Sequence, residues 1–161
     1  MKLGTLLFVP ADSEKKFGKA QTVGADALIL DLEDSVAPGA KIAARGPLAD
    51  WIAASQGPRD WSFWVRVNAF DTGLTEADLR AVVRPGLDGI VLPKSGGGHD
   101  VARLAAMIEP LEAAAGMADG HVMIIVVATE TATATARPSI MRTRLPRGYN
   151  GKSNKQRAQK R

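Results

Sequence analysis

Residues 28–36 read LILDLEDSV, an apolar run that delivers three carboxylates within four positions: Asp31, Glu33 and Asp34. A strand that is buried on both faces of a parallel sheet is nearly all Val, Ile and Leu. Carboxylates at the end of such a strand must be exposed, paired or bound to a ligand, because burying an unpaired charge is costly. The stretch therefore predicts a buried parallel strand that brings acidic groups to the edge of a sheet.

Further apolar segments lie on both sides of this stretch, at intervals that suit alternating strands and helices. The five expected strands are TLLFVP (5–10), ALILDLE (27–33), SFWVRVN (62–68), GIVLPK (89–94) and VMIIVVATE (122–130). Most of these runs are continuously apolar, which is typical of parallel strands covered on both faces.

The segments between the strands have helical composition. The four expected helices span residues 12–24, 38–55, 74–83 and 99–116. Thr75 and Asp78 have the spacing of a capping box at the start of the third helix. Gly46 and Pro47 should kink or split the second helix.

This alternation predicts a parallel α/β fold with right-handed crossovers. Two architectures fit five such units. One is a complete doubly wound sheet, and the other is the first five units of a (β/α)₈ barrel, which usually has about 250 residues. The pattern alone does not choose between them.

Composition narrows the possible chemistry. The chain has 161 residues, no cysteine and two histidines, His99 and His121, so it offers no thiol nucleophile, thiolate zinc site or histidine cluster. A metal would be held by oxygen atoms, which favours Mg²⁺. Neither a membrane-spanning run nor a signal-peptide core is evident, so the expected location is the cytoplasm.

The charge divides the chain into two parts. Residues 137–161 carry nine Lys and Arg and no acid, whereas residues 1–136 carry 12 basic residues against 17 acids. We expect one acidic domain over 1–136 and a basic, disordered tail over 137–161. The tail could contact anionic partners electrostatically, but without an RNA-binding motif nucleic acid is not the expected partner.

Polar residues should gather at the carboxyl ends of the strands, where parallel α/β folds place their sites. They are Asp31, Glu33, Asp34, Arg66, Asn68, Lys94 and Glu130. Glu130 and an acid of the 31–34 group could hold Mg²⁺ while Arg66 binds a substrate carboxylate. The metal would then polarise a carbonyl and stabilise an enolate.

Five blocks of sequence resemble one family, in the same order, over residues 3–134. The blocks are LLFVPADSEKKFGKA, GADALILDLEDSVAP..K..AR, WVRVNAFDTG, GLDGIVLPK and VATETA. Together they resemble the citrate lyase β-subunit-like proteins of the HpcH/HpaI aldolase and CoA-ester lyase superfamily, and five ordered blocks are far more specific than one short motif.

The resemblance implies a Mg²⁺-dependent (β/α)₈ barrel that cleaves or forms carbon–carbon bonds of hydroxy acids, often as citryl-, malyl- or citramalyl-CoA. It implies that Arg66 binds the carboxylate of the oxo acid and that Glu130 is a Mg²⁺ ligand. Glu33 and Asp34 would form an acidic shell with a catalytic role, and Lys94 would bind substrate at the rim. Intact relatives are expected to be homo-oligomers.

The resemblance stops near residue 135. The second Mg²⁺-ligating Asp of the family, in a WGAEDL-like segment, has no counterpart in this chain. The sequence therefore predicts five of eight βα units, from a truncation or a frameshift, with impaired lyase activity. Three alternatives remain open: an inactive fragment, a binding protein that uses its basic tail, and a subunit whose barrel a second chain completes.

Overall fold

The computed structural model describes residues 3–127, which form one five-stranded parallel sheet and its connecting helices. The strands are β1 (Leu6–Pro10), β2 (Ala27–Asp31), β3 (Ser62–Arg66), β4 (Gly89–Leu92) and β5 (Met123–Val126). The helices are α1 (Glu14–Ala20), α2 (Lys41–Ala54), α3 (Thr75–Val82) and α4 (Gly98–Ala114), with short 3₁₀ turns η1 (Pro38–Ala40) and η2 (Phe70–Thr72). All five expected strands are present, each somewhat shorter than its apolar run.

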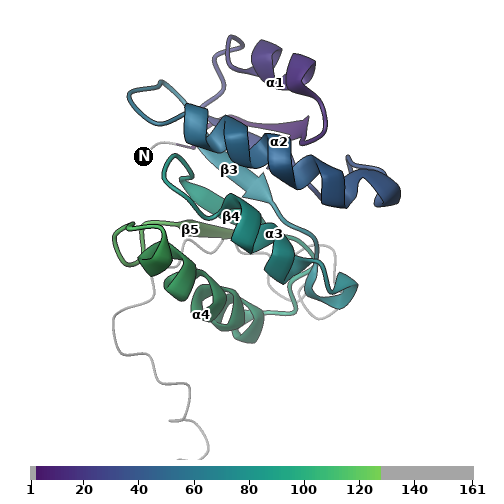
Figure 1. Cartoon of the computed structure of the whole chain (residues 1–161), viewed down its shortest axis with the longest axis vertical. Coiled ribbons are helices and arrows are strands. Elements are labelled where there is room, and N and C mark those ends of the chain that lie inside the picture. The colour runs from purple at the N-terminus through teal and green to yellow at the C-terminus, as the bar shows by residue number, and fades with distance from the viewer. Residues whose placement is uncertain (1–2, 128–161) are drawn as a thin grey trace, which may run out of the picture.

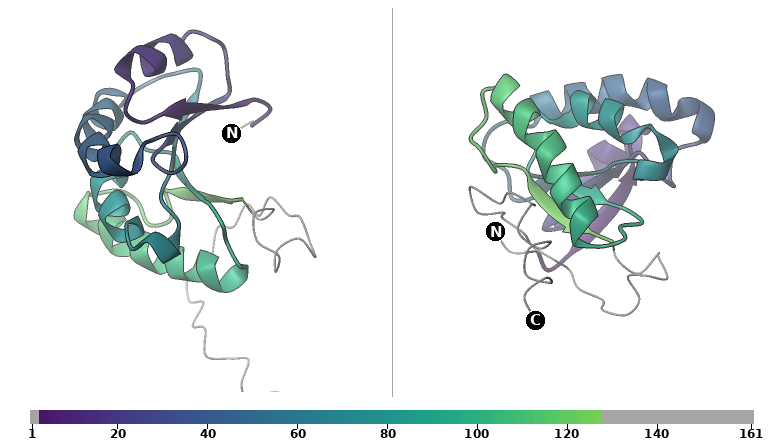
Figure 2. Two further views of the ribbon diagram at one scale, coloured as in Figure 1. Left: turned by 90° about the vertical axis from the view of Figure 1, so that its right-hand side faces the viewer. Right: turned by 90° about the horizontal axis from the view of Figure 1, so that it is seen from below.

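The strands lie side by side in chain order, from β1 to β5, and every neighbouring pair is parallel. The helices all lie along the outer face of the curved sheet (Figures 1 and 2). A doubly wound sheet reverses its strand order at a switch point and carries helices on both faces. The described residues therefore form four βα units and the fifth strand of a barrel, as the family resemblance implied, and the doubly wound alternative is wrong.

Side chains on successive strand positions alternate between two faces, as the pleat requires. The larger core cluster lies against the helices and includes Leu28, Leu30, Phe63 and Val65. A smaller cluster on the other face centres on Trp64, which is fully buried and donates from Nε1 to the Ser62 Oγ at 2.9 Å.

Gly89 makes room for the Trp64 ring. A Cβ at position 89 would lie 2.2 Å from a ring carbon of Trp64. Trp64 and Gly89 are partners across β3 and β4. This register therefore requires glycine, which has no side chain, beside the large Trp64 ring.

Helix α2 is one continuous helix that contains Pro47, so Gly46 and Pro47 do not split it, and of the two expected outcomes the split is wrong. Proline removes one backbone donor from a helix, yet three buried side chains of α2, Ala44, Leu48 and Ile52, pack against the core. Tertiary packing of this kind contributes most of the stability of a helix in a folded protein, and here it outweighs the local cost.

The expected capping box of α3 is also wrong. The residue before the helix is Leu74, and no side chain caps it. The Thr75 Oγ1 instead donates to the Asn68 carbonyl oxygen at 2.9 Å. Asp78 accepts from the Asn68 backbone N–H and from its Nδ2, both at 2.8 Å, and pairs with Arg45. Both side chains hold the loop after β3 rather than their own helix.

Two sequence predictions concern residues that the structure does not describe: the metal ligand Glu130 and the disordered basic tail over 137–161. Within residues 3–127, no helix has the length and apolarity needed to cross a bilayer. His99 and His121 are exposed.

Candidate functional site

The site begins with a pair of residues that the sheet register places together. Asp31 ends β2 and Arg66 ends β3, and these two positions are partners across the strands. Their side chains therefore leave the sheet on the same face, at the same edge. The Arg66 Nε donates to Asp31 Oδ1 at 2.8 Å and its Nη2 donates to Oδ2 at 2.7 Å, which makes a bidentate ion pair.

Asp31 is fully buried and fully hydrogen-bonded. Besides Arg66, it accepts from the backbone N–H of Glu33 at 2.9 Å, from that of Ser35 at 3.0 Å, and from the Ser35 hydroxyl. Burial raises the pKa of Asp31, but the hydrogen bonds from Arg66, Ser35 and the Glu33 backbone outweigh it and hold the pKa below the ordinary value of 3.8. Asp31 is thus a fixed anion whose oxygens are already used.

Arg66 is oriented by Asp31 and by a ring. Its Cζ lies 4.9 Å from the centroid of the Phe8 ring, in cation–π contact. Hydrogen bonding to Asp31 raises the pKa of Arg66 despite its burial, and the charges of Asp31, Glu33 and Asp34 act in the same direction. Its Nη1 lies 3.1 Å from Glu33 Oε2 and 3.7 Å from Asp34 Oδ2.

Glu33 and Lys94 complete the charged cluster. The Glu33 side chain is 4% exposed, and the Lys94 Nζ lies 2.8 Å from its Oε1. Neither this contact nor the contact with Arg66 has hydrogen-bond geometry, so both oxygens of the Glu33 carboxylate are buried without a hydrogen bond from any residue between 3 and 127. Lys94 has a φ of 49°, the one left-handed non-glycine backbone within residues 3–127. Asp34 is the outermost acid, with a side chain that is 62% exposed.

Lys41, the first residue of α2, is a site residue for which the sequence reasoning proposed no role. Its Nζ donates to the carbonyl oxygen of Leu32 at 2.9 Å, to that of Glu33, and to Asn68 Oδ1 at 2.6 Å. It therefore ties the loop that carries the acids to the loop after β3. Its spacing from Arg45, one turn further on, was the available signal, since such residues share a helix face.

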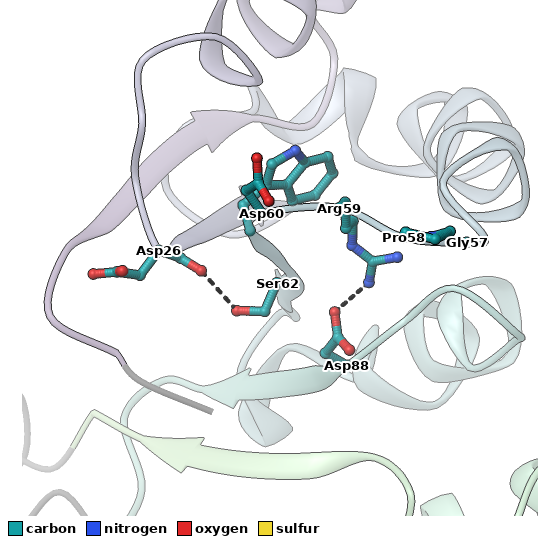
Figure 3. Close-up of a pocket in the computed structure, with 8 residues that line it drawn as sticks. Asp26, Gly57, Pro58, Arg59, Asp60, Ser62 and Asp88 are labelled. Carbon is teal, nitrogen blue, oxygen red and sulfur yellow. Dashed lines mark hydrogen bonds and ion pairs between the residues drawn. The ribbon is translucent and has the colours of Figure 1, made fainter.

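The opposite edge of the sheet carries a shallow depression of about 470 Å³ (Figure 3). Its lining includes Asp26, Ser62 and Asp88, which lie where β2, β3 and β4 begin. The Ser62 Oγ donates to the Asp26 carbonyl oxygen at 3.1 Å, and Asp88 pairs with Arg59. In (β/α)₈ folds this edge serves stability, while the carboxyl edge carries chemistry.

A metal site is not complete within the described residues. No group of three or more His, Cys, Asp or Glu side chains there could hold a metal ion. Asp31 is already saturated, which leaves Glu33 and Asp34 as the oxygen donors of the cluster. The described residues therefore do not fit a magnesium ion by themselves.

A curved parallel sheet with helices on its outer face and charged residues at the carboxyl ends of its strands is the arrangement found in TIM-barrel enzymes. The sequence model of the HpcH/HpaI aldolase/citrate lyase family matches residues 4–143. The chain belongs to this family, as its sequence blocks predicted.

Two curated relatives show the range of the family. The chain is 40% identical over 118 residues to citrate lyase subunit beta of Escherichia coli, an alignment that covers 72% of this chain and 38% of the relative. It is 36% identical over 107 residues to (3S)-malyl-CoA thioesterase of Cereibacter sphaeroides, covering 66% and 37%. The chain thus matches less than two-fifths of the length of these relatives.

Solved structures give the same result for the fold. A citrate lyase beta subunit from M. tuberculosis, complexed with oxaloacetate and magnesium, is 30% identical with a TM-score of 0.55, covering 86% of this chain and 64% of that one. A Haloferax volcanii malate synthase in a magnesium and glyoxylate complex has a TM-score of 0.70 at 18% identity, covering 82% and 44%. The second likeness supports the fold alone.

The structure brings most of the expected site residues together. Arg66 and Lys94 each contact the Glu33 carboxylate, and the exposed Asp34 lies 3.7 Å from Arg66 Nη1. Their chemical roles stay predictions, as does the role of Glu130. Sequence reasoning named Asp31 in the acidic group without separating its role from that of its neighbours.

Proposed function

We propose that the carboxyl edge of this sheet binds the carboxylate of an oxo acid, as part of a carbon–carbon lyase of the citrate lyase β-subunit type. The substrate class would be a hydroxyacyl-CoA of the citryl-, malyl- or citramalyl-CoA kind. The observation that carries the proposal is the Arg66 guanidinium, fixed by Asp31 with its Nη1 directed toward the acids of the rim.

The donor inventory of Arg66 supports carboxylate binding. Guanidinium has five N–H donors arranged as a planar fork. Asp31 uses the Nε and one Nη2 donor, which leaves the edge formed by Nη1 and Nη2 to face a ligand. Because Asp31 is buried and Phe8 supports the guanidinium, this edge is held in place before a ligand arrives.

Lys94 is the proposed second cation of the substrate site. Its Nζ and the Arg66 Nη1 lie on different oxygens of Glu33, so two positive groups flank one carboxylate position. Cleavage of the carbon–carbon bond of a hydroxyacyl thioester removes the hydroxyl proton and converts the hydroxyl carbon into the carbonyl of an oxo acid. The electron pair of the broken bond becomes the enolate of the thioester, which cations stabilise. Glu33 and Asp34 are the proposed proton-transferring groups of the rim.

Mg²⁺ is the proposed cofactor, and Glu130 is its proposed ligand. The support is the magnesium in the related structure from M. tuberculosis and the oxygen-only donor set of the chain. Since the described acids do not form a metal site alone, the substrate contacts are assigned to Arg66 and Lys94. A homo-oligomer remains the expected state of intact relatives.

Ligand binding tests the proposal more directly than turnover, because the chain spans less than two-fifths of the length of the two relatives from Escherichia coli and Cereibacter sphaeroides. Oxaloacetate is titrated into the 161-residue chain and into Arg66→Gln, with Arg80→Gln as the control. Arg80 is exposed and pairs only locally with Glu76. We expect binding that Arg66→Gln abolishes and Arg80→Gln leaves intact. Equal binding by all three proteins would contradict the proposal.

Magnesium-dependent cleavage of malyl-CoA or citryl-CoA, and its loss in Glu130→Ala, tests the chemistry.

A further inference from the structure

The carboxylate of Glu33 is anomalous among the buried acids of this structure. Its side chain is 4% exposed, and neither oxygen has a hydrogen bond. Asp31, two residues earlier, accepts five. Buried polar atoms are nearly always hydrogen-bonded, so a carboxylate held by charge alone requires an explanation.

The position of Glu33 suggests what that explanation is. Arg66 Nη1 lies 3.1 Å from Oε2, and Lys94 Nζ lies 2.8 Å from Oε1, so the carboxylate bridges two cations through separate oxygens. Arg66 cannot turn toward another partner, because Asp31 holds its Nε edge. Lys94 reaches its place from a left-handed backbone, and strain of this kind is concentrated at functional sites.

We propose that Glu33 is a displaceable counter-ion. It occupies the subsite between Arg66 and Lys94 when no ligand is bound, and the carboxylate of a ligand takes over both contacts when it binds. This inference rests on the proposed function, in which the rim binds an oxo acid. Replacing one carboxylate with another keeps an anion beside both Arg66 Nη1 and Lys94 Nζ, so the charge balance of the two cations is preserved.

The contrast with Asp31 shows why Glu33 is the acid that moves. Displacing Asp31 would break five hydrogen bonds in a fully buried place. Displacing Glu33 breaks none, and only two ion-pair contacts must be exchanged. Glu33 therefore competes with the ligand and lowers its affinity, while Asp31 positions the arginine that both of them use.

Titration calorimetry with oxaloacetate, in the presence of a metal chelator, tests the competition on the 161-residue chain. Removing the competitor in Glu33→Gln should lower the Kd for oxaloacetate about tenfold. Glu33→Asp keeps the charge but is too short to bridge both cations, and it should fall between wild type and Glu33→Gln. If Glu33→Gln does not fold by circular dichroism, Glu33→Asp carries the same test.

Asp34→Asn is the matched control. It removes the same charge 3.7 Å from the same Nη1, but from a side chain that is 62% exposed, and it leaves Glu33 in place. Solvent screens such a charge, so the Kd should change less than about twofold. Equal tightening in Asp34→Asn and Glu33→Gln would show general repulsion rather than displacement, and would overturn the inference.

The remaining outcomes separate this inference from the proposed function. If wild type binds oxaloacetate through Arg66 but Glu33→Gln binds it no more tightly, Glu33 is not a competitor, and only this inference fails. If Glu33→Gln binds and wild type does not, the competition is stronger than expected and the inference holds. If no variant binds oxaloacetate in the presence of the chelator, the inference fails, and the proposed function fails as well if an excess of magnesium does not restore binding.

Discussion

Carboxylates act differently at the two ends of the parallel strands, which we call the amino edge, where the strands begin, and the carboxyl edge, where they end. At the amino edge, Asp26 accepts from the backbone N–H groups of Gly4 and Thr5 at 2.9 and 2.7 Å. Asp88, beside it, accepts from the Phe63 N–H at 2.6 Å. At the carboxyl edge, Glu33 is more deeply buried than either of them, and its carboxylate accepts no hydrogen bond from the described residues.

The difference separates structural acids from functional ones. A carboxylate whose oxygens are filled by backbone donors ties one strand to the next and has nothing left to offer a ligand. By this criterion Asp31 belongs with Asp26 and Asp88, although it lies at the carboxyl edge. Within residues 3–127, the buried carboxylate of Glu33 contacts the cationic side chains of Arg66 and Lys94 and accepts from no backbone donor.

The largest expected effect is on stability, at Asp31. Asp31→Ala leaves Arg66 mostly buried without its partner and should lower the free energy of unfolding by about 3–5 kcal/mol. Urea unfolding followed by circular dichroism measures this. A loss of under about 1 kcal/mol would mean that Asp31 is not the structural acid of the carboxyl edge.

The amino edge should respond more weakly, and in stability only. Asp88→Ala removes the acceptor of the Phe63 N–H and the partner of Arg59, at a place that is partly open to water. We expect a loss of about 1–3 kcal/mol in the free energy of unfolding, with oxaloacetate binding unchanged. Altered binding in this variant would contradict the division of tasks between the edges.

The apolar pattern predicted the strands of this fold, and the family resemblance predicted the barrel, which is confirmed. The apolar runs located all five strands, because strands covered on both faces leave no gaps in the pattern. The same runs arise whether the helices cover one face or both, so the apolar pattern alone could not distinguish the barrel from the doubly wound sheet. Thr75 and Asp78 have capping spacing, but their partner Asn68 lies before the helix, in the loop after β3, and a capping pattern does not indicate that partner.

The candidate site was predictable in location but not in connectivity. Parallel pairing ends Asp31 and Arg66 at one edge, so their meeting follows from the register. Nothing in residues 31–35, DLEDS, indicates that the Asp31 carboxylate accepts hydrogen bonds from backbone N–H groups while the Glu33 carboxylate accepts none. The twist of the chain after the strand decides which carboxylate meets those donors. Lys41 went unassigned because two of its three acceptors are backbone carbonyl groups, which leave no trace in sequence.

Arg66→Lys tests whether the carboxyl edge needs a fork or only a charge. Lysine keeps the positive charge but cannot bind Asp31 and a ligand through two separate edges. Oxaloacetate binding should weaken about tenfold, which corresponds to about 1.4 kcal/mol. The Kd from calorimetry measures this, with Arg80→Lys as an exposed control. Unchanged affinity would show that charge alone suffices.

The smallest expected effect is on how steeply the free energy of unfolding depends on pH. The pKa of Asp31 is lowered on folding, so below the unfolded value of about 3.8 the unfolded chain binds a proton that the folded chain does not. Asp31 therefore contributes stability that is present above that pH and is lost as the pH falls toward its folded pKa.

Asp31→Asn has no proton to bind there, and its free energy of unfolding should decline less steeply than that of wild type as the pH is lowered below about 4. Urea unfolding of both proteins at a series of pH values measures the two slopes. Identical slopes would mean that Asp31 has the same proton affinity in both states, and its five hydrogen bonds could not then be what separates it from Glu33.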